Sequence, residues 1–241
     1  MLPVVVFSPL FGGELASRRF RAGVVAVLSG VFTLAIAPTV SEVPGGLDYG
    51  LLLVKETLVG TALALMLIFA FQLAAAVGSL IDISRGASLA MLQDPATRQQ
   101  LSTSGLFLSL LVLTLFIVGG GLGLVIGALA DSFALAPPHV FRVGPASDGG
   151  VAAAFTDAFT ALFALTVQLS MPVIVAVFLV DVGLALVNRA AAQVQVFFLG
   201  LTAKGWVGLA ALFAAIGVTV AESVEWAERL IAASLVWLGG G

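Results

Sequence analysis

Long runs without a charged side chain alternate with short polar stretches along this chain. Charge-free runs cover residues 22–40, 57–81, 99–130 and 158–180, and the run 190–221 is interrupted only by Lys204. A transmembrane helix needs about 20 apolar residues to cross a hydrocarbon core of about 30 Å. The pattern predicts four hydrophobic helices, one longer segment that folds back on itself, and a short apolar stub over residues 1–13.

The polar stretches between these runs are short. Residues 14–21 hold three arginines, residues 41–56 contain the turn signal Pro44-Gly45-Gly46, and residues 131–157 are rich in Pro and Gly. We expect the last of these stretches to lie outside the helix bundle. The amphipathic tail, 222–241, is expected to form an interfacial helix or a short helix that faces a partner. Together these features predict a single membrane domain over residues 1–241.

Composition excludes a soluble protein. Of the 241 residues, 61% are hydrophobic and 10% are charged, against roughly 25% charged residues in soluble domains. The net charge of −3 is spread along the chain, so no basic patch indicates nucleic-acid binding. The fold expected is therefore an all-α membrane protein built from about five to six hydrophobic segments.

The residues that membrane-embedded enzymes use are missing. The chain has no cysteine, and its single histidine, His139, lies beside Pro137-Pro138 in a polar stretch. An intramembrane zinc protease needs a histidine pair, and a serine protease of the rhomboid type needs a histidine at membrane depth. Asp82 and Asp181 lack the glycine-flanked context of an aspartyl protease. We therefore expect no enzyme activity, no catalytic residues, no metal and no cofactor.

Polar residues that follow the run 158–180 recur at intervals of seven. Asp181, Asn188 and Gln195 would share one face of a helix, with Arg189 and Gln193 alongside. Such a face would avoid lipid by packing on other helices or on water. The alternative is that residues 181–189 form a polar connection between two segments. The spacing leaves both interpretations open.

Charged pairs stand at two segment ends. Lys55 and Glu56 precede the run 57–81, and we expect them to mark a solvated helix start at the membrane interface. The alternative is that Glu56 faces the inside of the bundle. Asp82 and Arg85 are three residues apart, which is close enough for an ion pair on a helix or for a polar segment end. Pro172 lies within the run 158–180 and should kink or break that helix.

Three glycines in the run 99–130 have the spacing of a packing motif. Gly119, Gly123 and Gly127 repeat every four residues, which lets helix backbones approach closely. The alternative is the general enrichment of glycine in membrane helices, since the chain has 27 glycines. We favour packing.

Several stretches resemble one family, in the same order along nearly the whole chain. Residues 78–105 read GSLIDISRGASLAMLQDPATRQQLSTSG, which resembles the signature of the type III secretion export-apparatus protein SctT, homologous to the flagellar protein FliR. The stretches KETLVGTALAL (55–65), LADSFALAPP (129–138) and LALVNRAAAQVQVFFLGLTAK (184–204) also match. Two features depart from the family: Ala192 replaces a usual proline, and the first helix is shorter than in relatives, as in a truncated N-terminus. The Arg-Gly-Ala-Ser wording favours the injectisome branch.

The resemblance implies a core subunit of an export gate in the bacterial inner membrane. The expected partners are SctR/FliP-like, SctS/FliQ-like and SctU/FlhB-like membrane subunits, which form bent helical hairpins in a cone around a channel for unfolded secreted proteins. The implied channel seal comprises Gln99, Gln100, Leu101, Ser102, Thr103, Ser104, Gly105, Leu106 and Phe107. The residues proposed for assembly or packing are Glu56, Asp82, Arg85, Gly119, Gly123, Gly127, Asp181, Asn188, Arg189 and Gln193.

Two other functions fit the composition. A stand-alone transporter or channel for small solutes would show an internal repeat and broken helices in corresponding halves, and we find no convincing repeat. A plain membrane scaffold would leave the order of the motifs unexplained.

Overall fold

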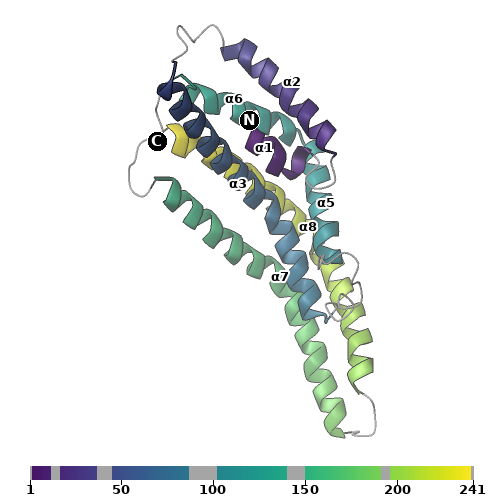
Figure 1. The fold of residues 1–241 in the computed structure, drawn as a ribbon. Helices are drawn as coiled ribbons and strands as arrows, with labels where there is room; N and C mark the ends of the chain where they lie inside the picture. The colour runs from purple at the N-terminus through teal and green to yellow at the C-terminus, as the bar shows by residue number, and fades with distance from the viewer. Residues whose placement is uncertain are drawn as a thin grey trace. The chain divides into compact units, whose positions relative to one another are not determined.

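The computed structural model describes residues 2–11, 17–36, 45–86, 102–139, 150–190 and 196–239. Every regular element in these residues is helical, which confirms the predicted all-α fold (Figure 1). The elements are α1 (Leu2–Phe7), the 3-10 helix η1 (Pro9–Phe11), α2 (Arg18–Ile36), α3 (Leu47–Ser84), α5 (Thr103–Val118), α6 (Gly121–Leu135), α7 (Gly150–Ala190) and α8 (Val196–Gly239).

Three of the described helices, α3, α7 and α8, are long and apolar enough to cross a membrane. The pair α5 and α6 adds a fourth span if its two bent halves are taken together. Helix α2 was predicted as a hydrophobic segment but is not among these spans; Arg18, Arg19 and Arg21 occupy its first turn. The prediction of a helical membrane protein is confirmed.

The run 99–130 is bent, as expected. Helices α5 and α6 meet at an angle of 74°. Gly120 has a φ of 89°, in the left-handed region that glycine tolerates and that ends a helix readily. Gly121 packs on the ring of Phe116, where any side chain would overlap that ring. The glycines here thus end one helix and begin the next.

Helix α3 begins ten residues earlier than the charge pattern indicated. It starts at Leu47, directly after Gly46, whose φ is 69°, and the side chain of Lys55 is fully buried. The expectation of a solvated helix start at Lys55 is therefore wrong. The ammonium group has polar partners inside the protein, described below, so its charge does not end the helix.

Helices α7 and α8 also extend past the charges and prolines of the sequence. Helix α7 continues to Ala190, so the alternative of a polar connection over residues 181–189 is wrong, and Pro172 lies inside the helix without breaking it. Helix α8 continues to Gly239, so the amphipathic tail is the last part of a long helix and not a separate one.

The chain divides into two compact units, which are described separately. The first unit comprises Met1–Phe71, Leu115–Thr160 and Glu225–Gly241. In it Trp226 Nε1 of α8 donates a hydrogen bond to the Phe69 carbonyl of α3 at 3.2 Å. The part of the amphipathic tail in this unit buries one face, which comprises Trp226, Ala227, Leu230, Ile231 and Ser234.

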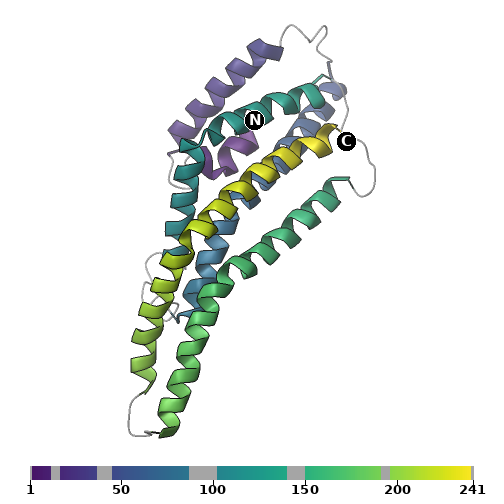
Figure 2. The same cartoon turned by 180° about the vertical axis from the view of Figure 1, so that it is seen from behind.

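The second unit comprises Gln72–Thr114 and Ala161–Val224. Within it α7 and α8 run side by side (Figure 2). An ion pair joins Lys204 of α8 to Asp181 of α7, and Gly200 lies against the side chain of Leu184. The last part of α3 packs on α5 in this unit, and this contact carries the candidate site.

Candidate functional site

Asp82 is a buried acceptor of three hydrogen bonds. It lies in the last turn of α3 and is 2% exposed. Its Oδ2 accepts from Ser102 Oγ at 2.7 Å and from the Ser104 amide at 2.9 Å, and its Oδ1 accepts from Ser104 Oγ at 2.6 Å. Bonds to an ionised carboxylate contribute roughly 1.5–3 kcal/mol each, more than bonds between neutral groups.

These three bonds all come from the start of α5. Ser102 precedes the helix, and its Oγ also accepts a hydrogen bond from the Gly105 amide at 2.8 Å, which is N-cap geometry. The first amides of a helix have no partner within the helix, and its N-terminus carries partial positive charge. A carboxylate at this place satisfies the Ser104 amide and opposes that charge.

A close crossing of α3 and α5 brings the carboxylate within reach. A Cβ at Gly78 would overlap with the backbone of Gly105, and a Cβ at Gly105 would stand 2.8 Å from the Ala75 carbonyl oxygen. Gly78 is one turn before Asp82 on the same face of α3. The two glycines therefore set the helix spacing that the hydrogen bonds of Asp82 require.

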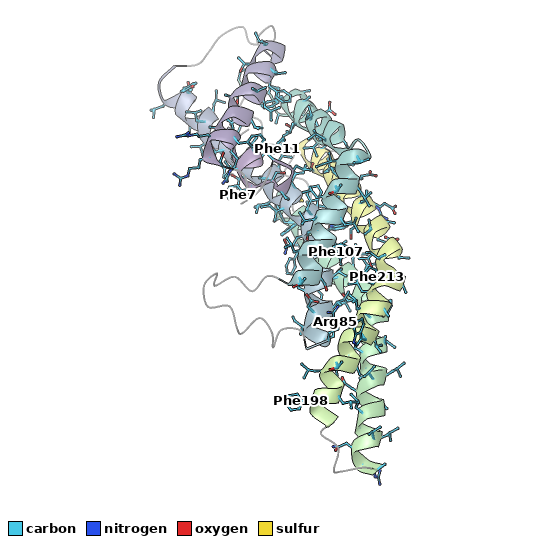
Figure 3. All side chains as sticks on the ribbon, turned by 90° about the vertical axis from the view of Figure 1, so that its right-hand side faces the viewer. Phe7, Phe11, Arg85, Phe107, Phe198 and Phe213 are labelled. Atoms are coloured by element: carbon cyan, nitrogen blue, oxygen red, sulfur yellow. The ribbon has the colours of Figure 1, made fainter. Side chains whose placement is uncertain are left out.

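Arg85 extends the site towards α8 (Figure 3). Its Nη1 is 3.9 Å from Asp82 Oδ1, so the ion pair predicted from their spacing is present at long range. Its Cγ and Cδ lie on Gly208, where a side chain would overlap them. Among the described residues, no hydrogen-bond partner reaches its buried Nε and Nη1.

A second buried charge, Lys55, lies in the first unit. Its Nζ donates a hydrogen bond to the Pro137 carbonyl at 2.8 Å and forms an ion pair with Glu56 Oε1 at 2.9 Å. Pro137 follows the C-terminal end of α6, where the helix carries partial negative charge. Sequence reasoning missed this role. The sequence signal for this role was the Pro44-Gly45-Gly46 motif. A helix that begins after this motif starts at Leu47, which places Lys55 well inside the helix.

The predicted channel-seal segment divides into two kinds of residue. Gln99, Gln100 and Leu101 lie outside the described residues. Among the others, a first set is buried against α3 and a second set is exposed, with Leu106 and Phe107 each 48% exposed. The buried set is Ser102, Ser104 and Gly105, and the exposed set is Thr103, Leu106 and Phe107.

The residues proposed for assembly are scattered. Asp82 and Arg85 meet at the α3–α5 crossing, whereas Glu56 pairs with Lys55 and Asp181 with Lys204. The remaining described ones are exposed, namely Gly119, Gly123, Gly127, Asn188 and Arg189. A Cβ at Gly123 or Gly127 would meet no atom of the described residues within 4 Å, so their packing stays a prediction about partners. Gln193 and Gln195 lie outside the described residues.

Chemically, the α3–α5 crossing is a set of fixed hydrogen bonds around one carboxylate. It fixes the first turn of α5 to α3, and the Arg85 side chain packs on Gly208 of α8. The site holds backbone in place.

Comparison with known proteins gives one consistent result. The family model described as "Bacterial export proteins, family 1" matches residues 1–229. Yop proteins translocation protein T of Yersinia pestis is 30% identical over 208 residues, which cover 85% of this chain and 76% of that protein. The flagellar biosynthetic protein FliR of Bacillus subtilis is 33% identical over 201 residues, covering 81% and 75%. Surface presentation of antigens protein SpaR of Shigella flexneri is 28% identical over 217 residues, covering 88% and 80%.

Proposed function

Because the chain belongs to the bacterial export proteins of family 1, we propose that it is a core subunit of a type III secretion export gate. In this role it forms, with partner subunits, the channel through which unfolded secreted proteins cross the bacterial inner membrane. The match to the family over residues 1–229 is the observation that carries the proposal. The translocation and flagellar proteins among its relatives support a role in protein export.

The apolar surface of α7 and α8 supports assembly with other subunits. Among the described residues, the membrane-spanning stretch of α7 is 17% buried and that of α8 is 28% buried, whereas that of α3 is 56% buried. In the part of α7 that belongs to the second unit, large exposed apolar side chains extend from Phe163 to Val187, roughly 36 Å at 1.5 Å per residue. This exceeds a hydrocarbon core of about 30 Å, so we assign part of the surface to partner helices.

The partners that fit such a surface are apolar helical proteins of the same apparatus. We assign it to the SctR/FliP-like, SctS/FliQ-like and SctU/FlhB-like subunits. Asn188 and Arg189, exposed at the C-terminal end of α7, are assigned to the same assembly. A solute transporter would favour broken helices in two matched halves, whereas the described residues hold one bent pair, α5 with α6.

Within the proposed seal, we assign the contact with the channel to Leu106 and Phe107. They follow directly on Ser102, Ser104 and Gly105, which are fixed to α3, and they are the exposed apolar residues of the segment. Large apolar side chains on a fixed first turn are suited to excluding water and ions from a narrow passage.

Ion conductance tests this assignment. The double variant Leu106→Ser/Phe107→Ser removes the apolar surface but keeps every hydrogen bond of Asp82, so the assembled gate in a planar bilayer should conduct ions more than the unchanged gate. Leu115→Ser, an exposed position farther along α5, is the matched control and should leave conductance unchanged. A double variant that assembles and conducts no more than the control contradicts the assigned seal.

A further inference from the structure

The hydrogen bonds at the start of α5 connect the amides of its first turn to one buried carboxylate, that of Asp82. The protected amides there belong to Ser104, Gly105 and Leu106, which are bonded to Asp82 Oδ2, Ser102 Oγ and the Ser102 carbonyl. Ser102 Oγ is itself held by Asp82 at 2.7 Å. The protection of these amides therefore depends directly or indirectly on Asp82.

We propose that Asp82 is a positioning residue, which fixes the rotation of α5 at its first turn and thereby aims Leu106 and Phe107. The proposal rests on the proposed function. Successive residues of a helix are about 100° apart, so the bonds that hold Ser104 and Gly105 against α3 set the direction of the two residues that follow. Leu106 and Phe107 are exposed because the preceding two residues are buried.

The three hydrogen bonds to Asp82 differ in whether they need an acceptor at residue 82. A serine hydroxyl can rotate to donate or to accept, whereas the Ser104 amide can only donate. Asparagine would keep one acceptor oxygen for that amide, but it would remove the charge that opposes the α5 N-terminus and faces Arg85 at 3.9 Å. Alanine would remove acceptor and charge together. The order of effect expected is therefore Ala greater than Asn.

Hydrogen–deuterium exchange on the assembled complex tests the positioning directly. In Asp82→Ala, the amides of Ser104, Gly105 and Leu106 should exchange roughly tenfold faster or more, which corresponds to losing one charge-assisted hydrogen bond. Asp82→Asn and Ser104→Ala should give smaller increases. Exchange near Val112 and the yield of complex should stay unchanged, since a general loss of fold would alter both. Glu225→Ala in α8, which removes a carboxylate whose side chain is 58% exposed, is the control.

Conductance of the same variants links the geometry to the gate. Faster first-turn exchange together with raised conductance in Asp82→Ala supports the proposal. Unchanged exchange, or faster exchange with unchanged conductance, overturns it. If Asp82→Ala does not assemble, exchange and conductance are measured instead in Asp82→Asn and Ser104→Ala. Unchanged conductance in Leu106→Ser/Phe107→Ser points instead to failure of the assigned seal, which the exchange data do not depend on.

Discussion

At the scale of single residues, two buried charges each face a helix end of opposite partial charge. Asp82 meets the N-terminus of α5, and Lys55 meets the carbonyl of Pro137 just beyond the C-terminus of α6. Both placements agree with the helix macrodipole, which favours a negative charge at the N-terminus of a helix and a positive charge at its C-terminus. A buried charge is tolerated when hydrogen bonds replace its water, so these residues can lie inside long apolar helices.

Replacing Lys55 should destabilise the protein, because its hydrogen-bond and ion-pair partners would be left unpaired. In Lys55→Met, the Pro137 carbonyl loses its donor and Glu56 loses its counter-charge. The expected cost is about 3 kcal/mol, at the lower end for a broken buried pair because the Glu56 side chain is 30% exposed. Thermal unfolding in detergent measures this loss.

The double variant Lys55→Met/Glu56→Gln should lose less stability than the single variant, because it leaves no uncompensated charge. Lys204→Met, which breaks a pair whose Asp181 side chain is 46% exposed, should cost less than about 1 kcal/mol. A double variant less stable than Lys55→Met contradicts this account of the pair.

The sequence could predict only part of these residue roles. The three-residue spacing of Asp82 and Arg85 predicted their pairing, because such neighbours share a helix face. The hydrogen bonds from Ser102 and Ser104 to Asp82 could not be predicted from spacing along one helix. They join residues separated by 20 and 22 positions in the sequence, which meet only where two helices cross. Lys55 was misplaced because a charge was taken as a segment end when the nearby turn was the better boundary.

At the scale of elements, the glycines that bring helices together are not the periodic ones. Gly78 and Gly105 meet at a crossing, whereas Gly123 and Gly127 face away from the rest of the described chain. Spacing alone gives a shared helix face but does not say what covers it. The crossing glycines lie on two different helices, so no single-helix pattern marks them.

Alanine substitutions at two helical glycines should therefore have opposite effects. Gly78→Ala forces a methyl group into the Gly105 backbone and should destabilise the protein by about 1–3 kcal/mol or more. Gly183→Ala in α7, where nothing lies within 4 Å, should stabilise it by roughly 0.5–1 kcal/mol through helix propensity. Chemical denaturation in detergent compares the two, and equal stability would refute the crossing.

At the scale of the whole molecule, the helices are longer than their charge-free runs. Helices α3, α7 and α8 have 38, 41 and 44 residues, where about 20 suffice to span a bilayer. The hydrophobic pattern correctly predicted an all-helical membrane protein. It underestimated the length of these helices, because it took charged residues as segment ends. Lys55, Asp82 and Asp181 lie within helices, and each has a partner of opposite charge.

The central claim is that this chain lines the path of exported proteins, and site-specific crosslinking tests it most directly. A photoreactive amino acid would replace Phe107 in the assembled apparatus, and the probe would be an exported protein fused to a domain that stays folded and stalls in transit. The account predicts a covalent adduct between position 107 and the stalled protein, and none when its secretion signal is removed. No adduct from Leu106 or Phe107, in an apparatus that is assembled and exporting, would contradict it.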